Sequence, residues 1–184
     1  MLARHCLLFV VLVVCVYTDL SHRKIYNWST LPAIFVGLLF NFVLGGLWEE
    51  GWSGANLGGS LIAVGVVLLI FGWPYLKGGI AAGDVKFMLA VAAIGGLRNF
   101  YIINALFYTA LIGFLMAILA LIWRGRLWAG LKGAFRFTFS IEAATSQAEG
   151  QKAPESKVTI PYGVAIAIGS LIAWYLVELP SQVL

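Results

Sequence analysis

The chain has 184 residues, of which 61% are hydrophobic and only 11% are charged. Water-soluble domains average roughly 45–50% apolar and about 25% charged residues, so this composition excludes an ordinary soluble domain. The mean hydropathy of +0.94 indicates instead one all-α membrane domain, residues 1–184, that crosses a lipid bilayer several times. We therefore expect the bilayer to be a partner of the chain, and we expect no nucleic acid.

The first apolar run covers residues 2–18 and has a basic start, as a signal peptide does. No small-x-small cleavage site follows it, and the chain continues directly into Asp19. We predict a retained first membrane helix with Asp19 at or just inside the interface, because roughly 20 residues cross the hydrocarbon core. Cys6 and Cys15 lie on opposite faces of this helix, so they cannot pair within it and are expected only to pack.

Five further apolar runs follow a polar segment at residues 20–30, so the sequence predicts about six transmembrane helices. These runs cover residues 31–47, 56–76, 85–97, 100–123 and 159–179.

One long loop, residues 124–158, separates the last two runs. Its first half, residues 127–139, has aromatic and aliphatic side chains on one side and basic residues on the other, which predicts an amphipathic helix at the membrane interface. A basic loop with chance aromatic residues is the alternative. The second half, residues 142–157, is polar and is predicted to be a flexible linker.

Lysine and arginine are unevenly distributed between the two sides of this six-span arrangement. Two of them, Arg4 and Arg98, fall on one side, and the other ten fall on the opposite side. Cytoplasmic loops carry an excess of these residues, so we predict that both termini face outward. Asp19 and Asp84 then lie at the cytoplasmic ends of their helices. The ten are Arg23, Lys24, Lys77, Lys86, Arg124, Arg126, Lys132, Arg136, Lys152 and Lys157.

Asp84 lies in the glycine- and alanine-rich stretch Gly78–Ala90, directly before the fourth apolar run. That run, residues 85–97, is about 20 Å long as a helix, against about 30 Å for the hydrocarbon core. Part of the preceding loop must therefore lie below the membrane surface. Non-helical backbone is tolerated there where it is buried in protein or lines a wet cavity. We predict that Asp84 lies in a partly enclosed, water-accessible pocket.

Asp19 and Asp84 are candidates for a catalytic pair. Two carboxylates that share a site cannot both ionise at low cost, so one of them holds a proton. The ionised one can take a proton from water while the protonated one polarises a carbonyl, which is the chemistry of aspartic peptide hydrolysis. It needs no metal and no cofactor. The sequence contains no H-E-x-x-H, no G-x-S-x-G and no cysteine–histidine set.

Three other features near the candidate pair are interpreted as structural. His22, beside Asp19, is expected to be interfacial, with catalysis as the alternative. Lys86 is expected to extend to the lipid headgroups and mark the topology, with an effect on Asp84 as the alternative. Small-x-x-x-small rows let membrane helices approach closely, and we interpret them here as packing without chemistry. The rows are Gly113 and Ala117, Gly163 and Ala167, and Ala165, Gly169 and Ala173.

Two segments carry a resemblance to the type IV prepilin peptidases. Asp19-Leu20-Ser21-His22-Arg23-Lys24-Ile25-Tyr26-Asn27 resembles their first motif, D-x-x-x-R-x-I-x-N. Ala81-Ala82-Gly83-Asp84-Val85-Lys86 resembles their second motif, G-x-G-D-V-K. The segment 160–167 is similar to the closing helix of the short, pilus-assembly branch, and archaeal preflagellin peptidases share the same plan.

The resemblance implies an aspartic endopeptidase of the cytoplasmic membrane that removes the short basic leader of prepilin-like proteins at the cytoplasmic face. Asp19 and Asp84 match the family's catalytic aspartates, and Gly83 and Lys86 match the residues that support the second motif. The chain departs from the family at Ala81, where the first glycine is expected, and at Tyr26, where proline is common. It also lacks the cysteine-rich insert of the larger members, and we expect no methylation activity.

The alanine in the second motif leads to a conformational expectation. A glycine there could serve a positive φ or only a close approach of two backbones. Since this chain carries alanine, we predict a negative φ at Ala81, and we expect Gly83 to be the strained position.

Two other functions remain open at this point. A proton-coupled transporter could use Asp19 and Asp84 as a relay, although a relay favours ionisable groups near the bilayer midplane and often an inverted repeat, which the sequence does not show. A non-catalytic scaffold for pilus assembly is the third possibility.

Overall fold

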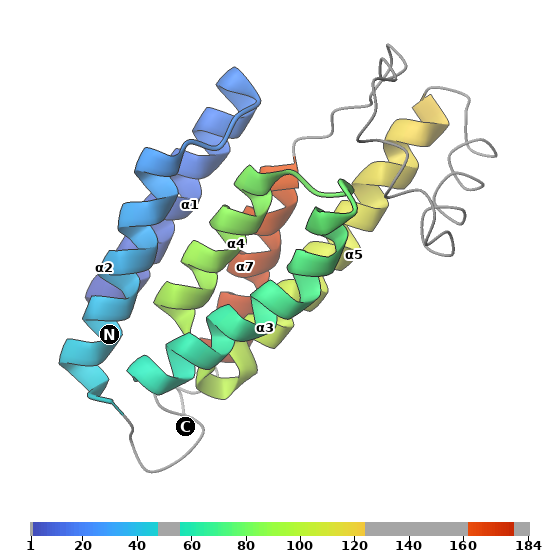
Figure 1. Ribbon diagram of the computed structural model, residues 1–184. Coiled ribbons are helices and arrows are strands. Elements are labelled where there is room, and N and C mark those ends of the chain that lie inside the picture. Colours follow the sequence, from blue (N-terminus) through green and yellow to red (C-terminus); the bar gives the residue numbers. More distant parts are fainter. Residues whose placement is uncertain (1, 48–55, 124–161, 179–184) are drawn as a thin grey trace.

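Figure 1 shows the computed structural model of the chain, which describes residues 2–47, 56–123 and 162–178. The described residues form helices and no strand, as the composition predicts. The elements are α1 (Leu2–His22), α2 (Asn27–Gly45), α3 (Leu57–Leu76), α4 (Ala82–Gly95), the short 3₁₀-helix η1 (Arg98–Phe100), α5 (Tyr101–Trp123) and α7 (Tyr162–Glu178). The predicted amphipathic segment 127–139 and linker 142–157 lie outside the described residues.

Four of the described helices are long and apolar enough to cross a membrane, namely those spanning Arg4–His22, Asn27–Gly45, Leu57–Leu76 and Arg98–Trp123. The fourth and last apolar helices, α4 and α7, are shorter, so the predicted count of about six spans is not confirmed by length. Many large aliphatic and aromatic side chains are exposed on the outside of the bundle.

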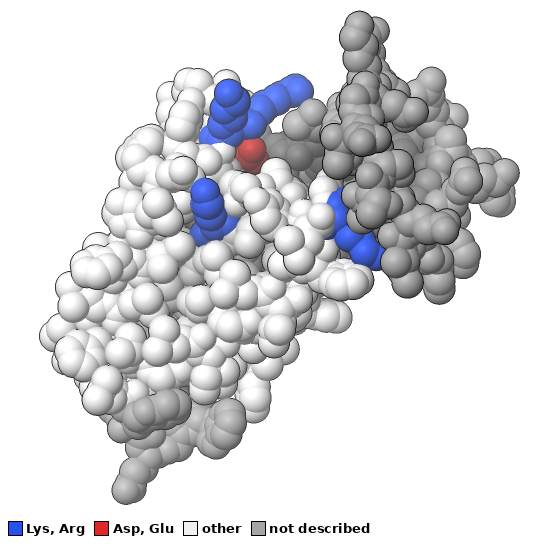
Figure 2. Space-filling model, in the orientation of Figure 1, with Lys and Arg blue, Asp and Glu red and all other residues white. Residues whose placement is uncertain are grey.

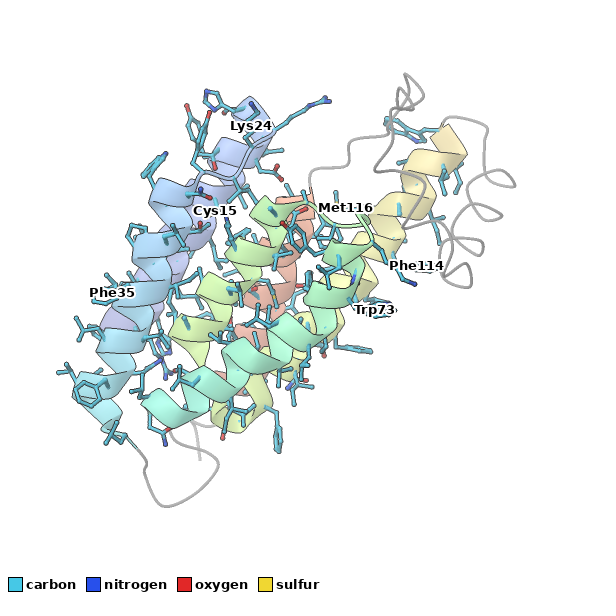
Figure 3. All side chains as sticks on the ribbon, viewed as in Figure 1. Cys15, Lys24, Phe35, Trp73, Phe114 and Met116 are labelled. Carbon is cyan, nitrogen blue, oxygen red and sulfur yellow. The ribbon has the colours of Figure 1, made fainter. Side chains whose placement is uncertain are left out.

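Phe35, Trp73 and Phe114 point away from the helices in Figure 3 and are 69%, 64% and 63% exposed. An outer surface with so many exposed apolar side chains indicates contact with lipid rather than with water. Together with the four apolar helices they identify a membrane protein.

Several helix ends differ from the ends of the predicted spans. α1 continues to His22 and α2 begins at Asn27, so most of the segment predicted as a polar loop, residues 20–30, is helical. α4 covers 82–95 rather than 85–97. Hydropathy reports which residues lie in hydrocarbon, whereas a helix continues into the interface as long as its backbone hydrogen bonds are made. Asp19 is therefore one turn inside α1, and Asp84 is in the first turn of α4.

Helix α4 is at the centre of the bundle, and α1, α2, α3, α5 and α7 all pack against it (Figure 1). Nine of its 14 residues are buried, among them Phe87, Met88 and Ile94. This burial shows that α4 is surrounded mainly by protein and not by lipid. With a length of about 21 Å, α4 is shorter than a bilayer core, but it is enclosed by longer helices.

The carboxyl end of α4 lies inside the bundle, where Asn41 of α2 binds it. The side-chain Nδ2 of Asn41 donates to the carbonyl oxygens of Ala93 at 2.9 Å and Ile94 at 3.1 Å, and to Oγ of Ser60 at 2.7 Å. The last four carbonyls of a helix have no partner within it, and a bilayer core offers no water to replace one. Fully buried Asn41 thus allows α4 to end early.

Glycines let the helices around α4 come close together. A Cβ at Gly169 of α7 would lie 2.5 Å from the backbone nitrogen of Thr109 in α5, and one at Gly113 of α5 would lie 2.6 Å from the ring of Tyr162. Real Cβ atoms do not approach so closely. The packing prediction for Gly113 and Gly169 is therefore confirmed.

Candidate active site

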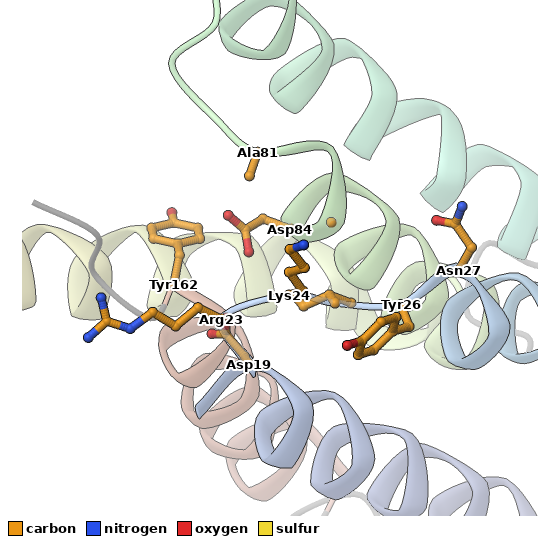
Figure 4. Close-up of a pocket in the computed structure, with 10 residues that line it drawn as sticks. Asp19, Arg23, Lys24, Tyr26, Asn27, Ala81, Asp84 and Tyr162 are labelled. Atoms are coloured by element: carbon orange, nitrogen blue, oxygen red, sulfur yellow. The ribbon is translucent and has the colours of Figure 1, made fainter. Parts of the chain in front are cut away.

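The end of the bundle where α1 ends and α4 begins holds a pocket of about 380 Å³ (Figure 4). Both predicted candidates, Asp19 and Asp84, line this pocket, although they come from different helices. The other described residues around it are Arg23, Lys24, Ile25, Tyr26, Asn27, Ala81, Gly83 and Tyr162. The structure thus brings the first motif, the second motif and the start of α7 to one place.

Asp19 is held firmly at the wall of this pocket. Its side chain is only 8% exposed, and its Oδ2 accepts a hydrogen bond from the backbone N–H of Gly163 at 3.0 Å. Gly163 is the second residue of α7, where N–H groups have no partner within the helix. A carboxylate near the amino end of a helix is also favoured by the helix dipole. The N–H of Gly163 thus gains an acceptor, and the carboxylate of Asp19 gains a donor.

Asp84 has a different environment. It lies in the first turn of α4, half-buried, and its side chain is drawn beside the phenol of Tyr162 in Figure 4. Among the described residues, no donor forms a hydrogen bond to its carboxylate, whereas Asp19 has Gly163. Asp84 is consequently the carboxylate that is left available to a molecule entering the pocket.

The two motifs meet side by side, at Gly83 and Ile25. A Cβ placed on Gly83 would lie 3.1 Å from Cβ of Ile25 and 3.5 Å from its carbonyl oxygen. This approach brings the start of α4 against the segment between α1 and α2. It brings the two aspartates to the same pocket because Gly83 directly precedes Asp84 and Ile25 lies shortly after Asp19.

The expectation that Gly83 is conformationally strained is wrong. Among the described glycines, positive φ occurs at Gly46, Gly78 and Gly96, and Gly83 is an ordinary helical residue of α4. The absence of a side chain at Gly83 favours the close approach to Ile25, and no special backbone conformation is involved. The prediction for Ala81 is confirmed, because its φ is −74°.

Lys86 contacts the first motif directly. Its Nζ donates to Oδ1 of Asn27 at 2.8 Å, in an exposed position. This contact adds a role to the one expected for Lys86, which was to mark the topology near the headgroups. On the face shown in Figure 2, lysine and arginine side chains surround an acidic patch at one end of the molecule. His22 makes an edge-to-face contact with Tyr26 and does not line the pocket.

Two residues of the site, Tyr162 and Gly163, were not predicted to take part in it. Gly163 was interpreted as a packing residue, and the structure identifies what it packs against, which is the carboxylate of Asp19 in α1. The ring of Tyr162 packs against Gly113, and Tyr162 also lines the pocket. The only sequence signal was the similarity of segment 160–167 to a family's closing helix. A local pattern does not tell where that helix docks.

No three His, Cys, Asp or Glu side chains gather to form a metal site in the described part of the chain. The free cysteines are also separate from the pocket lining: Cys6 is exposed on the outside of α1, and Cys15 is buried.

Comparison with known proteins bears on this site. A model of the type IV leader peptidase family matches residues 6–123, which include both aspartates and both motifs but not α7. No curated protein and no solved structure matches the chain. The family match confirms the resemblance to type IV prepilin peptidases.

Proposed function

This chain belongs to the type IV leader peptidase family and is a membrane protease, and from that premise we propose that it is an aspartic endopeptidase. In this proposal it removes the N-terminal leader of prepilin-like proteins at the cytoplasmic face of the membrane. Asp19 and Asp84 are its two catalytic residues.

One observation carries the proposal. Asp19 and Asp84 belong to separate motifs on separate helices, yet they line the same pocket. A carboxylate near a membrane core is costly and is usually functional. Two of them facing one pocket of about 380 Å³ supply the acid and the base that hydrolysis of a peptide bond requires.

The reaction follows from the protonation of the pair. The ionised aspartate takes a proton from a water molecule, and the oxygen of that water attacks the scissile carbonyl carbon. The protonated aspartate gives its proton to the carbonyl oxygen, which yields a neutral gem-diol intermediate. Collapse of the intermediate breaks the C–N bond: the leaving nitrogen takes a proton from the aspartate that first acted as base, and one gem-diol hydroxyl returns its proton to the aspartate that first acted as acid. The leader carboxyl group and a free N-terminal amine are the products.

The position of the pocket fits a substrate that is itself a membrane helix with an N-terminal extension. The pocket is at one end of the bundle and not at its middle, so the peptide bond next to an apolar helix can reach it. Arg23 and Lys24 line the same end. The excess of lysine and arginine on this side supports the cytoplasmic orientation.

The same position argues against a proton relay. A relay through the bilayer needs ionisable groups along the path, near the midplane. Here both aspartates are at one end of the bundle, and the buried centre of α4 beyond Asp84 is apolar. A scaffold without catalysis would have no use for two carboxylates facing one pocket.

The test is leader cleavage in cells that express the chain together with a panel of prepilin-like proteins, read by intact mass. Asparagine keeps the size of aspartate but cannot exchange the proton, so Asp19→Asn and Asp84→Asn should each abolish cleavage at normal accumulation. The double variant should be no worse than either single one, because residues that act as a unit are not additive. Chelators and reagents directed at serine or cysteine should leave cleavage unchanged.

Glu178→Gln, at the far end of α7, is the matched control for the loss of one carboxylate and should cleave normally. Substantial cleavage by either aspartate variant, at the accumulation of the control, would falsify the dyad. Uncleaved substrate in every pairing, with the unaltered chain present and folded, would favour the scaffold.

A further inference from the structure

The start of α7 touches the proposed catalytic base or acid directly, at a position outside the part of the chain that matches the family. The backbone N–H of Gly163 donates to Oδ2 of Asp19 at 3.0 Å. Both residues are buried, which limits the competition of bulk water for this hydrogen bond. Among the described residues, the N–H of Gly163 is the donor that binds the carboxylate of Asp19.

The contact requires glycine. A Cβ at position 163 would lie 2.7 Å from Oδ2 of Asp19, 3.1 Å from its Cγ and 3.2 Å from its Cβ. Rotating the carboxylate would relieve only the first of these contacts, and Cγ and Cβ of Asp19 would still have to shift by a few tenths of an ångström. The whole Asp19 side chain would have to move, or α7 would have to withdraw from α1.

We propose that Gly163 is a positioning residue for Asp19: its N–H holds Oδ2, and its lack of a side chain lets α7 come close enough to do so. This inference rests on the proposed function, in which Asp19 is catalytic. With Oδ2 bound to α7, the carboxylate has one orientation, and Oδ1 is the oxygen left to exchange a proton with water or substrate. Docking of α7 thereby completes the catalytic pair.

Gly169, on the same helix, separates this role from ordinary packing. A Cβ there would lie 2.5 Å from the nitrogen and from Oγ1 of Thr109, in α5, and its three nearest atoms all belong to Thr109. Gly163→Ala therefore acts on the contact between α7 and Asp19 of α1, whereas Gly169→Ala acts on the packing of α7 against α5. Gly72→Ala, on α3, is a neutral control, because nothing lies within 4 Å of its Cβ position.

The experiment uses purified full-length protein and the one prepilin-like protein that the unaltered chain cleaves best in the co-expression panel. We expect Gly163→Ala to lower kcat by roughly 100-fold with KM nearly unchanged, since displacing a catalytic group by about 1 Å costs on that order. Gly169→Ala should lose thermal stability but keep kcat per folded molecule. Equal kcat values for Gly163→Ala and Gly169→Ala, per folded molecule, would overturn the inference.

A second measurement does not depend on activity. If the added methyl collides with the Asp19 side chain, removing that side chain should make room for it. Gly163→Ala should therefore cost less thermal stability in an Asp19→Ala background than in the unaltered chain, and the accumulation of a poorly folding Gly163→Ala variant should recover in the double variant. An equal cost in both backgrounds, or no recovery, contradicts the contact.

The failure of this inference can be told apart from failure of the proposed function. If the Asp19→Asn variant still cleaves, the proposed function fails, because Asp19 is then not catalytic. If Asp19→Asn is inactive but Gly163→Ala is fully active, the catalytic pair is supported. Only the positioning role of Gly163 is then contradicted.

Discussion

Nζ of Lys86 and Oδ1 of Asn27 are 2.8 Å apart, and this hydrogen bond joins the last residue of the second motif to the last residue of the first. Lys86 belongs to α4 and Asn27 to the start of α2. Together with the approach of Gly83 to Ile25, it sets the two motifs in register next to the pocket. The motifs are thus two halves of one structural unit.

The first prediction concerns this hydrogen bond. Lys86→Met keeps the length of the side chain but removes its donor, and we expect leader cleavage to fall roughly two- to tenfold, as for loss of one exposed hydrogen bond of a charged group. Asn27→Ala should have the same effect, and the double variant should be no worse than either. Lys77→Met is the matched control, because Nζ of Lys77 lies over the ring of Trp73 and away from the motifs. Additive losses would show that the two residues act separately.

The second prediction concerns Gly83 and Ala81. Gly83→Ala places a methyl group 3.1 Å from Cβ of Ile25, so either the loop or the start of α4 must move and carry an aspartate with it. We expect a loss of cleavage of tenfold or more, on the order expected for misplacing a catalytic group. Ala81→Gly should be tolerated, because φ at this position is already negative. Full cleavage by Gly83→Ala, with cleavage abolished by Ala81→Gly, contradicts this assignment.

The third prediction concerns Asn41. Asn41→Leu leaves two carbonyls at the end of α4 without a donor in a place that water does not reach, at about 1–3 kcal/mol for each buried group. We expect a clear loss of thermal stability in detergent. Asn104→Leu is the matched control, because the exposed hydrogen bond of Asn104 goes to the carbonyl of Phe100, four residues earlier, and its loss should cost little. Equal stability of the two variants would show that Asn41 is not needed to end α4.

The fourth prediction concerns topology, and it depends on the distribution of lysine and arginine. A reporter fused at Gly150 should be cytoplasmic, and one fused at Gly51 should be outside. Both positions lie outside the described residues. Finding both reporters on the same side would contradict the six-span arrangement and the cytoplasmic position of the active site.

The sequence alone predicted the all-helical membrane fold and the two aspartates, for a local reason. An apolar run must become a helix in a bilayer because each backbone group needs a partner within its own segment. A carboxylate beside such a run is unusual enough to be noticed without knowing its neighbours, as Asp84 shows. The helix ends were predicted less well, because residues 20–30 are polar and yet mostly helical. Hydropathy indicates where the lipid core ends, whereas a helix ends where its backbone hydrogen bonds end.

The tertiary structure alone decided what surrounds the two aspartates. The sequence assigned Gly83 a strained φ, which is wrong, and it assigned Gly163 to helix packing without identifying the neighbour. Their neighbours are Ile25 and Asp19, which come from other parts of the chain. A glycine in a membrane helix has the same local pattern whether it faces a backbone, a side chain or lipid. Only the docking of α7 and α4 against α1 determines which of these it meets, because that docking sums many small contacts spread along the whole chain.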